Sequence, residues 1–409
     1  MRSYGFTKYA GIQPAVRSAL DWLWENGGLP LIKGEWFFVD PESGTATGAG
    51  TAESPVESLA TAYGLCTSGA GDGIVVLSSG TSGSTTTSYL DTPLTWSKWG
   101  ITTVGICAGG MMGHRARVTN VQRTTGSITT LAFGSTTTIT DSASGFLTAG
   151  FEVGNILSID STSNLNDAEA ATITAVTAGT ITCSASSFTP EVAGAAGATV
   201  ITSYMPNLIT LTGSNNIFAN LLLNNGDENV LSVGGLEIQG NRNVFSNCQI
   251  YGASHATPAA AVGAYDLRMN GAAENTFFGC TIGGQTVAKS AANGCITFIA
   301  GNGQNHWIDC TILSQSSTAG HGAIKSESNT ACGGMEIFKR CTFINWKANG
   351  ASALTSAFIG TAFPSGYILM DACTLFGWAA WDSVGSNNII YVANSAVVAS
   401  GAGGIATTV

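Results

Sequence analysis

The chain has 409 residues, of which only 10% are charged, and 25 acidic against 15 basic residues give a net charge of −10. Typical soluble domains carry about 25% charged residues. The absence of any Lys/Arg cluster argues against a nucleic-acid-binding protein. A content of 44% hydrophobic residues excludes ordinary disorder. With 53 glycines, the composition favours short strands joined by tight turns.

The first segment, residues 1–34, lacks the apolar core of a signal peptide, and no apolar run is long enough to span a membrane. We therefore expect a protein that is made in the cytoplasm and is not exported by the usual route. A short amphipathic helix with Trp22 and Trp24 is predicted here, ended by a double glycine. Such a helix serves as an anchoring arm on a partner surface or docks back on its own chain, and both readings stay open.

Residues 35–120 are predicted to hold a strand, a capping helix and the first strands of a coil. The helix is expected at 54–66, with Ser54 as N-cap, Pro55 at its first position and Glu57 closing a capping box. Four apolar residues share one face of this helix and are expected to cover the open end of the coil: Leu59, Ala62, Tyr63 and Cys66. The first strands of the coil are expected within 71–80 and 99–110.

Residues 121–204 lack the strand pattern of the segments before and after them. Short alternating strands separated by Gly, Asn and Thr turns predict a compact β-barrel or sandwich. We interpret the segment as an inserted module, because the neighbouring pattern resumes at residues 206–213.

Residues 205–409 contain a repeated phrase that ends in Cys-x-hydrophobe, with intervals of 32, 30, 31 and 32 residues between its cysteines: Cys248, Cys280, Cys310, Cys341 and Cys373. A short alternating strand precedes each phrase. A period of this size indicates a solenoid. The absence of helical patterns between the strands predicts an all-β fold, a parallel β-helix of about ten rungs.

The repeat predicts which residues face inward. The cysteines are expected to form a buried ladder rather than disulfides, since cysteine is readily buried and no CxxC or zinc spacing occurs. A second inward column is expected three residues before them: Phe245, Phe277, Trp307, Phe338 and Met370. An asparagine ladder is expected at a turn: Asn215, Asn243, Asn275 and Asn305.

These segments carry a resemblance. The run from "WFFVDPESGT" through the capped helix to "GDGIVVLSSGT" resembles the opening of right-handed parallel β-helix proteins of the pectate-lyase-like superfamily, and phrases such as "ENTFFGCTI" resemble its rungs. More narrowly, the whole resembles β-helix structural proteins of tailed bacteriophage particles. The resemblance covers about residues 35–120 and 205–400. It implies a virion component that is released by lysis, and a homotrimer.

No catalytic, cofactor-binding or metal-binding residue stands out. The candidates for a carboxylate pair are expected to form ion pairs between successive rungs instead, since opposite charges are favoured on neighbouring strands: Glu237, Asp266, Arg268, Asp309, Lys339, Arg340 and Asp371. The four histidines are scattered and are expected on polar loops: His114, His255, His306 and His321. No calcium loop, nucleophile constellation or phosphate-binding loop is present.

Two classes of function follow from this sequence. The first is a non-enzymatic structural protein, a decoration or cement protein of a phage head, with residues 1–34 bound to the major capsid protein or another virion protein. The alternative is a tailspike or fibre that binds or degrades a host surface polysaccharide. A lectin that binds its receptor without catalysis is intermediate between these two classes. Self-association as a homotrimer is predicted along the coil or through its C-terminal end, where Trp378 and Trp381 were expected to offer an apolar surface.

Overall fold

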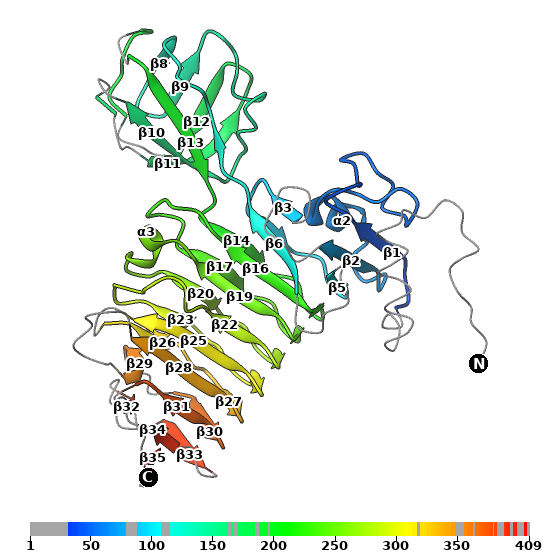
Figure 1. Cartoon of the computed structure of the whole chain (residues 1–409), viewed down its shortest axis with the longest axis vertical. Helices are drawn as coiled ribbons and strands as arrows, with labels where there is room; N and C mark the ends of the chain where they lie inside the picture. Colours follow the sequence, from blue (N-terminus) through cyan, green and yellow to red (C-terminus); the bar gives the residue numbers. More distant parts are fainter. Residues whose placement is uncertain are drawn as a thin grey trace.

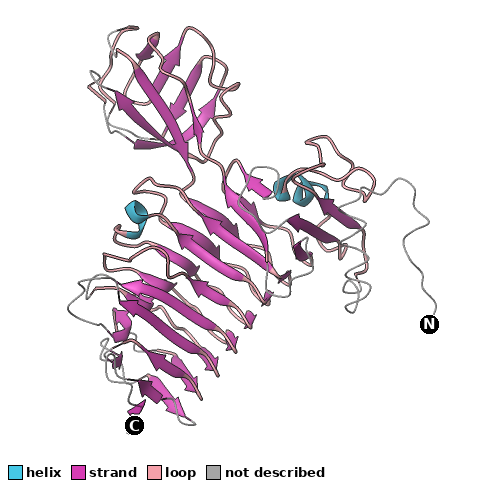
Figure 2. Ribbon diagram, viewed as in Figure 1, coloured by secondary structure: helices cyan, strands magenta, loops and turns pink. Residues whose placement is uncertain are grey.

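A computed structural model shows an all-β chain wound into a right-handed parallel β-helix, as predicted (Figure 1, Figure 2). The structure describes residues 32–78, 88–107, 115–161, 165–166, 170–184, 188–194, 197–316, 320–347, 356–362, 365–378, 380–382, 388–392, 396–398 and 405–406. The predicted arm at 1–34 therefore lies almost wholly outside the described residues, and so does His114. No helix in the described ranges is long and apolar enough to cross a membrane.

Three sheets, which we call A, B and C, form the faces of the coil. Sheet A contains β1 (Trp36–Val39), β2 (Gly73–Ser78), β5 (Thr102–Cys107), β15 (Ile217–Ala219), β18 (Val244–Ser246), β21 (Thr276–Phe278), β24 (His306–Ile308), β27 (Met335–Lys339), β30 (Tyr367–Asp371) and β33 (Ile389–Val392). Sheet B contains β3 (Ser88–Leu90), β6 (Ala116–Asn120), β16 (Leu221–Asn225), β19 (Gln249–Ala253), β22 (Thr281–Gly283), β25 (Thr311–Ser316), β28 (Thr342–Lys347), β31 (Thr374–Phe376), β34 (Ala396–Val398) and β35 (Ile405–Ala406). Sheet C contains β4 (Leu94–Trp96), β14 (Asn207–Leu211), β17 (Gly234–Ile238), β20 (Tyr265–Met269), β23 (Gly294–Phe298), β26 (Gly322–Ser326), β29 (Ser356–Gly360) and β32 (Ala380–Asp382).

Each rung of the coil pairs in parallel with the rungs before and after it. Phe245 lies opposite Phe218 and Phe277 in sheet A, and Leu236 lies opposite Ile209 and Leu267 in sheet C. The single exception among the described pairs of the coil is the last one, β34 with β35, which is antiparallel. In the described residues sheets A and B have ten strands each and sheet C has eight, so about eight turns have a strand on all three faces, against the ten rungs expected.

The capping helix α2 spans Leu59–Leu65 and is shorter than predicted. Its N-cap is Ser58 and not Ser54. The Ser58 side chain accepts a hydrogen bond from the backbone N–H of Thr61 at 3.2 Å. Val56, two residues before Ser58, is fully buried and bridges to Val39 of β1, so this segment is not helical. This tertiary pairing outweighs the local helix-start signal. The predicted apolar face is confirmed: Leu59, Ala62, Tyr63 and Cys66 are buried against the first rungs.

The two inward columns are confirmed. The five ladder cysteines are at most 1% exposed, and all ten cysteines of the chain are free thiols. Each ladder thiol donates to the backbone carbonyl of a column residue one rung earlier, as Cys280 does to Phe245 and Cys341 does to Trp307. The rings of Phe277 and Trp307 stack at a centroid distance of 3.9 Å and an angle of 3°. The columns thus continue from rung to rung through the interior of the coil.

The asparagine ladder is confirmed with one correction: its first member is Asn216 and not Asn215. Ile217 pairs with Val244, so the residue that precedes it in the chain matches Asn243. Asn216 donates its backbone N–H to the side-chain oxygen of Asn243 at 2.9 Å. Asn215 instead has a φ of 57°, a left-handed conformation that asparagine tolerates in turns.

The asparagine ladder ends on a buried acid that the sequence did not point out. Asn305 donates its side-chain amide to Oε1 of Glu336 at 2.7 Å, and the indole N–H of Trp307 donates to Oε2 at 3.2 Å. Burial raises the pKa of Glu336 to about 8, although both hydrogen bonds favour the ionised carboxylate. Glu336 therefore holds its proton at neutral pH.

Between β6 and β14 the chain forms a separate antiparallel sheet. Its seven strands pair in the order β7 (Arg123–Thr124), β13 (Thr199–Tyr204), β10 (Ile156–Ser161), β11 (Ala170–Val176), β12 (Thr180–Cys183), β9 (Thr138–Asp141) and β8 (Leu131–Phe133). This sheet has a hydrophobic cluster of its own that includes Phe133, Phe146 and Phe188, and it projects from the side of the coil (Figure 1). We propose that these strands form the inserted module that the sequence predicts.

The predicted apolar surface at the C-terminal end is wrong. Trp378 is fully buried, and Trp381 packs its ring edge-on to Phe343 at 5.5 Å between centroids. Both side chains fill the interior of the last rungs, so they are not free to form a contact with another copy.

Candidate functional site

The candidate site is a surface groove over sheet B, formed by two adjoining hollows. The larger hollow has a volume of about 440 Å³ and the smaller one about 280 Å³. The larger hollow is lined by Arg117, Leu222, Asn224, Gln249, Tyr251, Ser254, Gly284, Gln285, Thr286 and Leu313. The smaller hollow is lined by Arg117, Thr119, Asn120, Gln122, Asn224, Gly226, Asp227 and Glu228. Arg117 and Asn224 line both, so the two hollows adjoin each other over sheet B, and we refer to them together as the groove.

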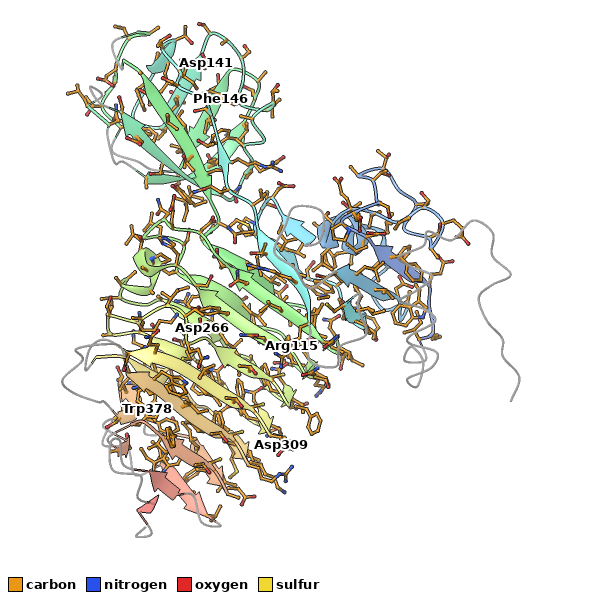
Figure 3. All side chains as sticks on the ribbon, in the orientation of Figure 1. Arg115, Asp141, Phe146, Asp266, Asp309 and Trp378 are labelled. Atoms are coloured by element: carbon orange, nitrogen blue, oxygen red, sulfur yellow. The ribbon has the colours of Figure 1, made fainter. Side chains whose placement is uncertain are left out.

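The groove follows from the register of three strands of sheet B. Arg117 pairs with Leu222, which in turn pairs with Gln249. Alternate residues of a strand point to the same face, so Arg117 and Leu222 project outward while Val118 and Leu223 are buried in the core. Arg115 precedes β6 on the same outward face, and it donates to the backbone oxygen of Asn247 at 2.6 Å (Figure 3).

A tyrosine forms part of the wall of the larger hollow. The hydroxyl of Tyr251 lies 3.0 Å from the hydroxyl of Thr286, and the backbone of Gly284 crosses the ring so closely that a Cβ there would lie 2.6 Å from it. Burial raises the pKa of Tyr251 to about 12. The ring is thus held in one position, next to the exposed side chains of Gln285 and Thr286.

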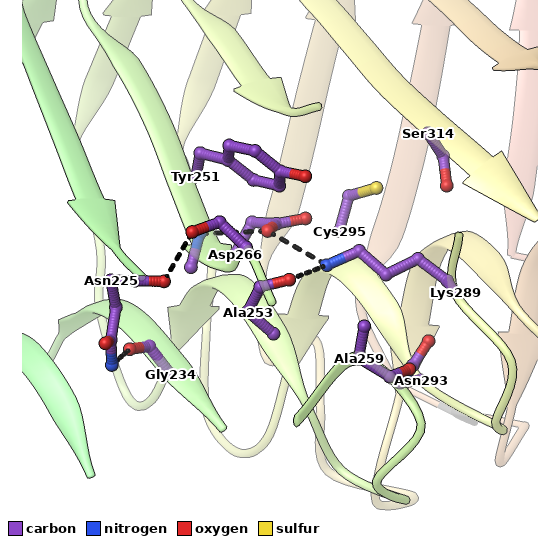
Figure 4. A network of polar contacts seen from close by, with 12 residues as sticks. Asn225, Gly234, Tyr251, Ala253, Ala259, Asp266, Lys289, Asn293, Cys295 and Ser314 are labelled. Atoms are coloured by element: carbon purple, nitrogen blue, oxygen red, sulfur yellow. Dashed lines mark hydrogen bonds and ion pairs between the residues drawn. The ribbon is translucent and has the colours of Figure 1, made fainter. Parts of the chain in front are cut away.

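A buried ion pair lies beneath this wall (Figure 4). Lys289 donates to the backbone carbonyl of Ala253 at 2.9 Å and lies 3.3 Å from Oδ1 of Asp266, with both side chains at most 2% exposed. The same Oδ1 accepts the backbone N–H of Gly252 at 2.9 Å. Since Gly252 and Ala253 follow Tyr251 in β19, the ion pair fixes the strand that carries the groove tyrosine. Breaking a buried pair of this kind is strongly destabilising.

A cysteine, a histidine and an asparagine meet next to this ion pair, but their environment does not favour nucleophilic catalysis. Nε2 of His321 lies 3.9 Å from Sγ of Cys295, and Nδ1 lies 2.7 Å from Oδ1 of Asn293. All three side chains are buried. Burial raises the pKa of Cys295 and lowers the pKa of His321 to about 3, so the thiolate and the imidazolium are both disfavoured. This cluster supports the fold beneath the groove.

The smaller hollow contains two adjacent carboxyl groups. Burial raises the pKa of Asp227 to about 7, and its Oδ2 accepts the backbone N–H of Met205 at 2.5 Å. Glu228 is exposed and accepts a hydrogen bond from the side-chain amide of Gln122 at 3.3 Å. A carboxyl group that is partly protonated at neutral pH beside an exposed carboxylate is an arrangement suited to acid–base chemistry.

The candidate carboxylates of the sequence do not line the groove. Glu237 and Arg268 pair across neighbouring strands of sheet C at 3.8 Å, as predicted. Asp309 receives two hydrogen bonds from Arg340, at 2.7 Å and 2.8 Å, at a turn on the margin of the coil (Figure 3). Lys339 and Asp371 are neighbours in register. Asp266 is the exception to the expected surface pairs, because it is buried with Lys289.

The histidines are divided between the surface and the interior. His255 is the N-cap of α3 (Ala256–Ala259), and its Nε2 lies 4.0 Å from Glu228. His306 is exposed on β24. The expectation of a polar loop is wrong for His321, which packs inside between Ser314 and Asn293. Within the described ranges no three His, Cys, Asp or Glu side chains are grouped so that they could hold a metal ion.

Sequence reasoning missed the residues that line the groove. Arg117 lies before the inserted strands and Asn224 after them, so the sequence gives no sign that they share a wall. The phrase "NNGDEN", which begins at the end of β16 and contains Asp227 and Glu228, offers one signal. An acidic pair in a polar loop at the end of a rung lies outside the repeat.

No family model and no curated protein matches the chain. Among solved structures it is similar to the tailspike protein gp49 of Pseudomonas phage LKA1, with 13% identity, a TM-score of 0.24, and coverage of 74% of this chain and 54% of that one. The Gp54 tailspike of Acinetobacter baumannii bacteriophage AP22, in complex with a capsular saccharide, has 10% identity, a TM-score of 0.17 and coverage of 80% and 70%. A rhamnogalacturonan lyase has 11% identity, a TM-score of 0.32 and coverage of 87% and 84%. The chain spans about half the length of the first tailspike.

These likenesses do not assign chemistry to this chain. They give no support to the prediction of a non-enzymatic protein. A lyase, a lacto-N-biosidase and a glycoside hydrolase are found alongside the tailspikes. We therefore correct that prediction: sparse charge and a β-helix coil do not by themselves indicate a protein without activity.

Proposed function

We propose that this protein is a tailspike-like component of a phage particle and binds a polysaccharide of the host surface in the groove over sheet B. The observation that carries the proposal is the groove itself. It extends over successive rungs of a rigid coil, and amides, hydroxyls and a tyrosine line it. Side chains of this kind form hydrogen bonds with sugar hydroxyls and pack against sugar rings.

The coil suits a repetitive ligand. Adjacent strands of sheet B are about 4.8 Å apart, so equivalent side chains recur along the groove at that spacing. Gln249 of β19 and Gln285 after β22 both line the larger hollow. Neither amide is part of the core columns, so both can bind a ligand without a cost to the fold.

Binding can be tested with a double variant, Gln249→Ala with Gln285→Ala, and a panel of bacterial surface polysaccharides immobilised for biolayer interferometry. We expect the wild-type protein to retain at least one polysaccharide and the double variant to bind it at least tenfold more weakly, as the loss of two hydrogen bonds implies. The matched control is Gln239→Ala on sheet C, whose amide contacts Glu237 away from the groove. Equal binding by the double variant would refute the groove as the site.

Cleavage of the bound polysaccharide is the second candidate function, and the pKa of Asp227 favours it. At neutral pH this carboxyl group is partly protonated, and the protonated form can donate its proton to the oxygen of a glycosidic bond. The exposed carboxyl group of Glu228 in the same hollow can stabilise positive charge on the sugar or activate a water molecule. Burial of Asp227 keeps a proton available for the donor role.

The test for cleavage is the release of reducing ends from the polysaccharide that the protein binds. Glu228→Gln and Asp227→Asn should each lower the rate by at least a hundredfold, in the range of acid–base contributions, while binding persists. Since Asp227 also accepts the N–H of Met205, the melting temperature of each variant must be measured as well. Glu274→Gln, at an exposed ion pair with Arg242, is the control and should keep full activity. Equal rates in all variants would refute this pair of acids.

The predicted role as a head decoration protein is set aside in favour of the tailspike alternative, because the groove gives the chain a ligand-binding surface that a decoration protein does not need. The homotrimer stays a prediction, without the Trp378 and Trp381 surface on which it partly rested. Light scattering of the purified chain measures the mass directly, and a monomer would contradict it.

A further inference from the structure

The arginines of the coil differ in whether they have a carboxylate partner. Six arginines lie in the described part of the chain, and four form an ion pair with a carboxylate: Arg123 with Asp91, Arg242 with Glu274, Arg268 with Glu237 and Arg340 with Asp309. Arg115 and Arg117 have no carboxylate of a described residue within 4.0 Å. Arg117 lies on the outward face of β6 and lines the groove, whereas Arg115 lies just before β6 and is not among the lining residues.

The guanidinium of Arg117 makes fewer hydrogen bonds than that of Arg115. The Arg117 guanidinium donates no hydrogen bond to any described residue, and its Nε is buried without a partner. Arg115 donates to Asn247 and reaches Oε1 of Gln249 at 3.5 Å, so its guanidinium borders the same groove. A buried N–H group without a partner is costly, and such a group in a native structure calls for an explanation.

Charge in the groove is distributed unevenly. In the larger hollow Arg117 is the one charged residue among those that line it, and the rest are amides, hydroxyls and apolar groups. The acids Asp227 and Glu228 line the smaller hollow, which Arg117 also lines. A chain with a net charge of −10 that places an unpaired guanidinium in a binding hollow has a local site for an anion.

We propose that the polysaccharide is acidic and that Arg117 binds a carboxylate of one of its sugars in the larger hollow, assisted by Arg115 at the rim. This inference rests on the proposed function and specifies its substrate class. A guanidinium and a carboxylate form two parallel hydrogen bonds in one plane, an arrangement that a neutral sugar cannot reproduce. The sugar carboxylate would take the place of the protein carboxylate that the four paired arginines have.

The experiment compares each capsular polysaccharide of a bacterial panel with the same polysaccharide after reduction of its carboxyl groups to alcohols. We expect the wild-type protein to bind a uronate-containing polysaccharide about ten- to a hundredfold more tightly than its reduced form, the range of a hydrogen bond to a charged group. Added salt should weaken the binding of the acidic form. Arg117→Ala should lower the affinity for the acidic form by a similar factor and leave binding of the reduced form unchanged. Arg117→Lys should restore part of the affinity.

The matched control is Arg242→Ala, which removes an exposed arginine that already has a carboxylate partner, and its binding should equal that of the wild type. Binding of the reduced form as tightly as the acidic form, or full affinity in Arg117→Ala, would overturn this inference. Binding that is confined to neutral polysaccharides but is lost in the Gln249 and Gln285 double variant would overturn it and leave the proposed function standing. No binding to any polysaccharide would overturn both.

Discussion

The backbone N–H and the side-chain amide of Asn243 both donate to the side-chain oxygen of Asn275, at 2.8 Å and 3.1 Å. Asn275 repeats the same pair of bonds to Asn305 at 2.9 Å and 3.0 Å. Because all three side chains are buried, each rung satisfies polar groups of the previous one that water cannot reach. The ladder therefore joins successive turns by side chains in addition to the strand pairing.

Replacement of Asn275 by alanine should destabilise the coil strongly. Two buried donors of Asn243 would lose their acceptor, at a cost of about 1–3 kcal/mol each. We expect the free energy of unfolding in urea to fall by about 2–5 kcal/mol. Gln285→Ala, at an exposed position, should change it by less than about 0.5 kcal/mol. A loss for Asn275→Ala no larger than for the control would contradict the ladder as a stabilising element.

Stability should depend on pH through Glu336. Its pKa is raised from 4.5 to about 8 by burial, so the native state binds the proton more tightly than the unfolded chain does. The contribution is complete below about pH 4.5 and is lost as pH rises towards 8, with a slope of at most about 1.4 kcal/mol per pH unit. Titration of Asp227 likewise lowers the stability as pH rises, between its ordinary pKa of 3.8 and its raised pKa of about 7.

The interval from pH 7 to 8 separates the two acids, because the pKa of Asp227 is about 7 and that of Glu336 about 8, so most of the change there comes from Glu336. Glu336→Gln should be less stable than the wild type at pH 5, since its amide cannot accept hydrogen bonds from both Asn305 and Trp307. Between pH 7 and 8, however, its free energy of unfolding should fall less steeply than that of the wild type. Chemical unfolding at several pH values measures both effects. Glu274→Gln, whose carboxyl pKa is lowered by Arg242, should keep the wild-type slope. A slope in Glu336→Gln as steep as in the wild type would argue against titration of Glu336.

Thiol reagents should distinguish the ladder from Cys107. The five ladder cysteines are buried in the core, whereas Cys107 at the end of β5 is partly exposed. We expect slow labelling of Cys107 in the native protein and labelling of Cys248, Cys280, Cys310, Cys341 and Cys373 only after unfolding in denaturant. Mass spectrometry of the labelled peptides gives the order in which the cysteines react. Rapid native labelling of all five ladder thiols would rule out the inward ladder.

Deletion of residues 122–203, with a short Gly/Ser linker, should leave the coil folded. The chain leaves and re-enters the coil at β7 and β13, which are paired antiparallel through Arg123 with Ser203, so the two ends lie side by side. The deletion removes the ion pair of Arg123 with Asp91 and the bond from Asn155 to the Asp91 carbonyl, both outside the core columns. Cooperative unfolding followed by circular dichroism measures the outcome. Insoluble expression, or loss of cooperativity, would show that these strands are needed by the coil.

The sequence alone determined the coil, its period and its inward columns. Residues such as Cys280 and Phe277 pack against the equivalent residue one rung away, so the same residue type is required about every 31 residues and the repeat is visible. The ion pair of Asp309 with Arg340 was predictable for the same reason, since partners in register differ in sequence by one period. Local signals were less reliable: Ser54 has the pattern of a helix start, but pairing of Val56 with Val39 keeps that segment out of the helix.

Only the tertiary structure determined the groove. Its partly exposed residues, such as Arg117, Leu222 and Gln249, lie in register but differ in type from rung to rung, so no period in the sequence marks them. Arg117 and Asn224 are also separated in sequence by the inserted strands, and register across sheet B is what places them in one wall. The support beneath the groove, Asp266 with Lys289, joins different segments of the coil in the same way. Packing between rungs requires the same residue type at each period, so it can be seen in the sequence. A binding surface is formed by positions on which packing places no such requirement.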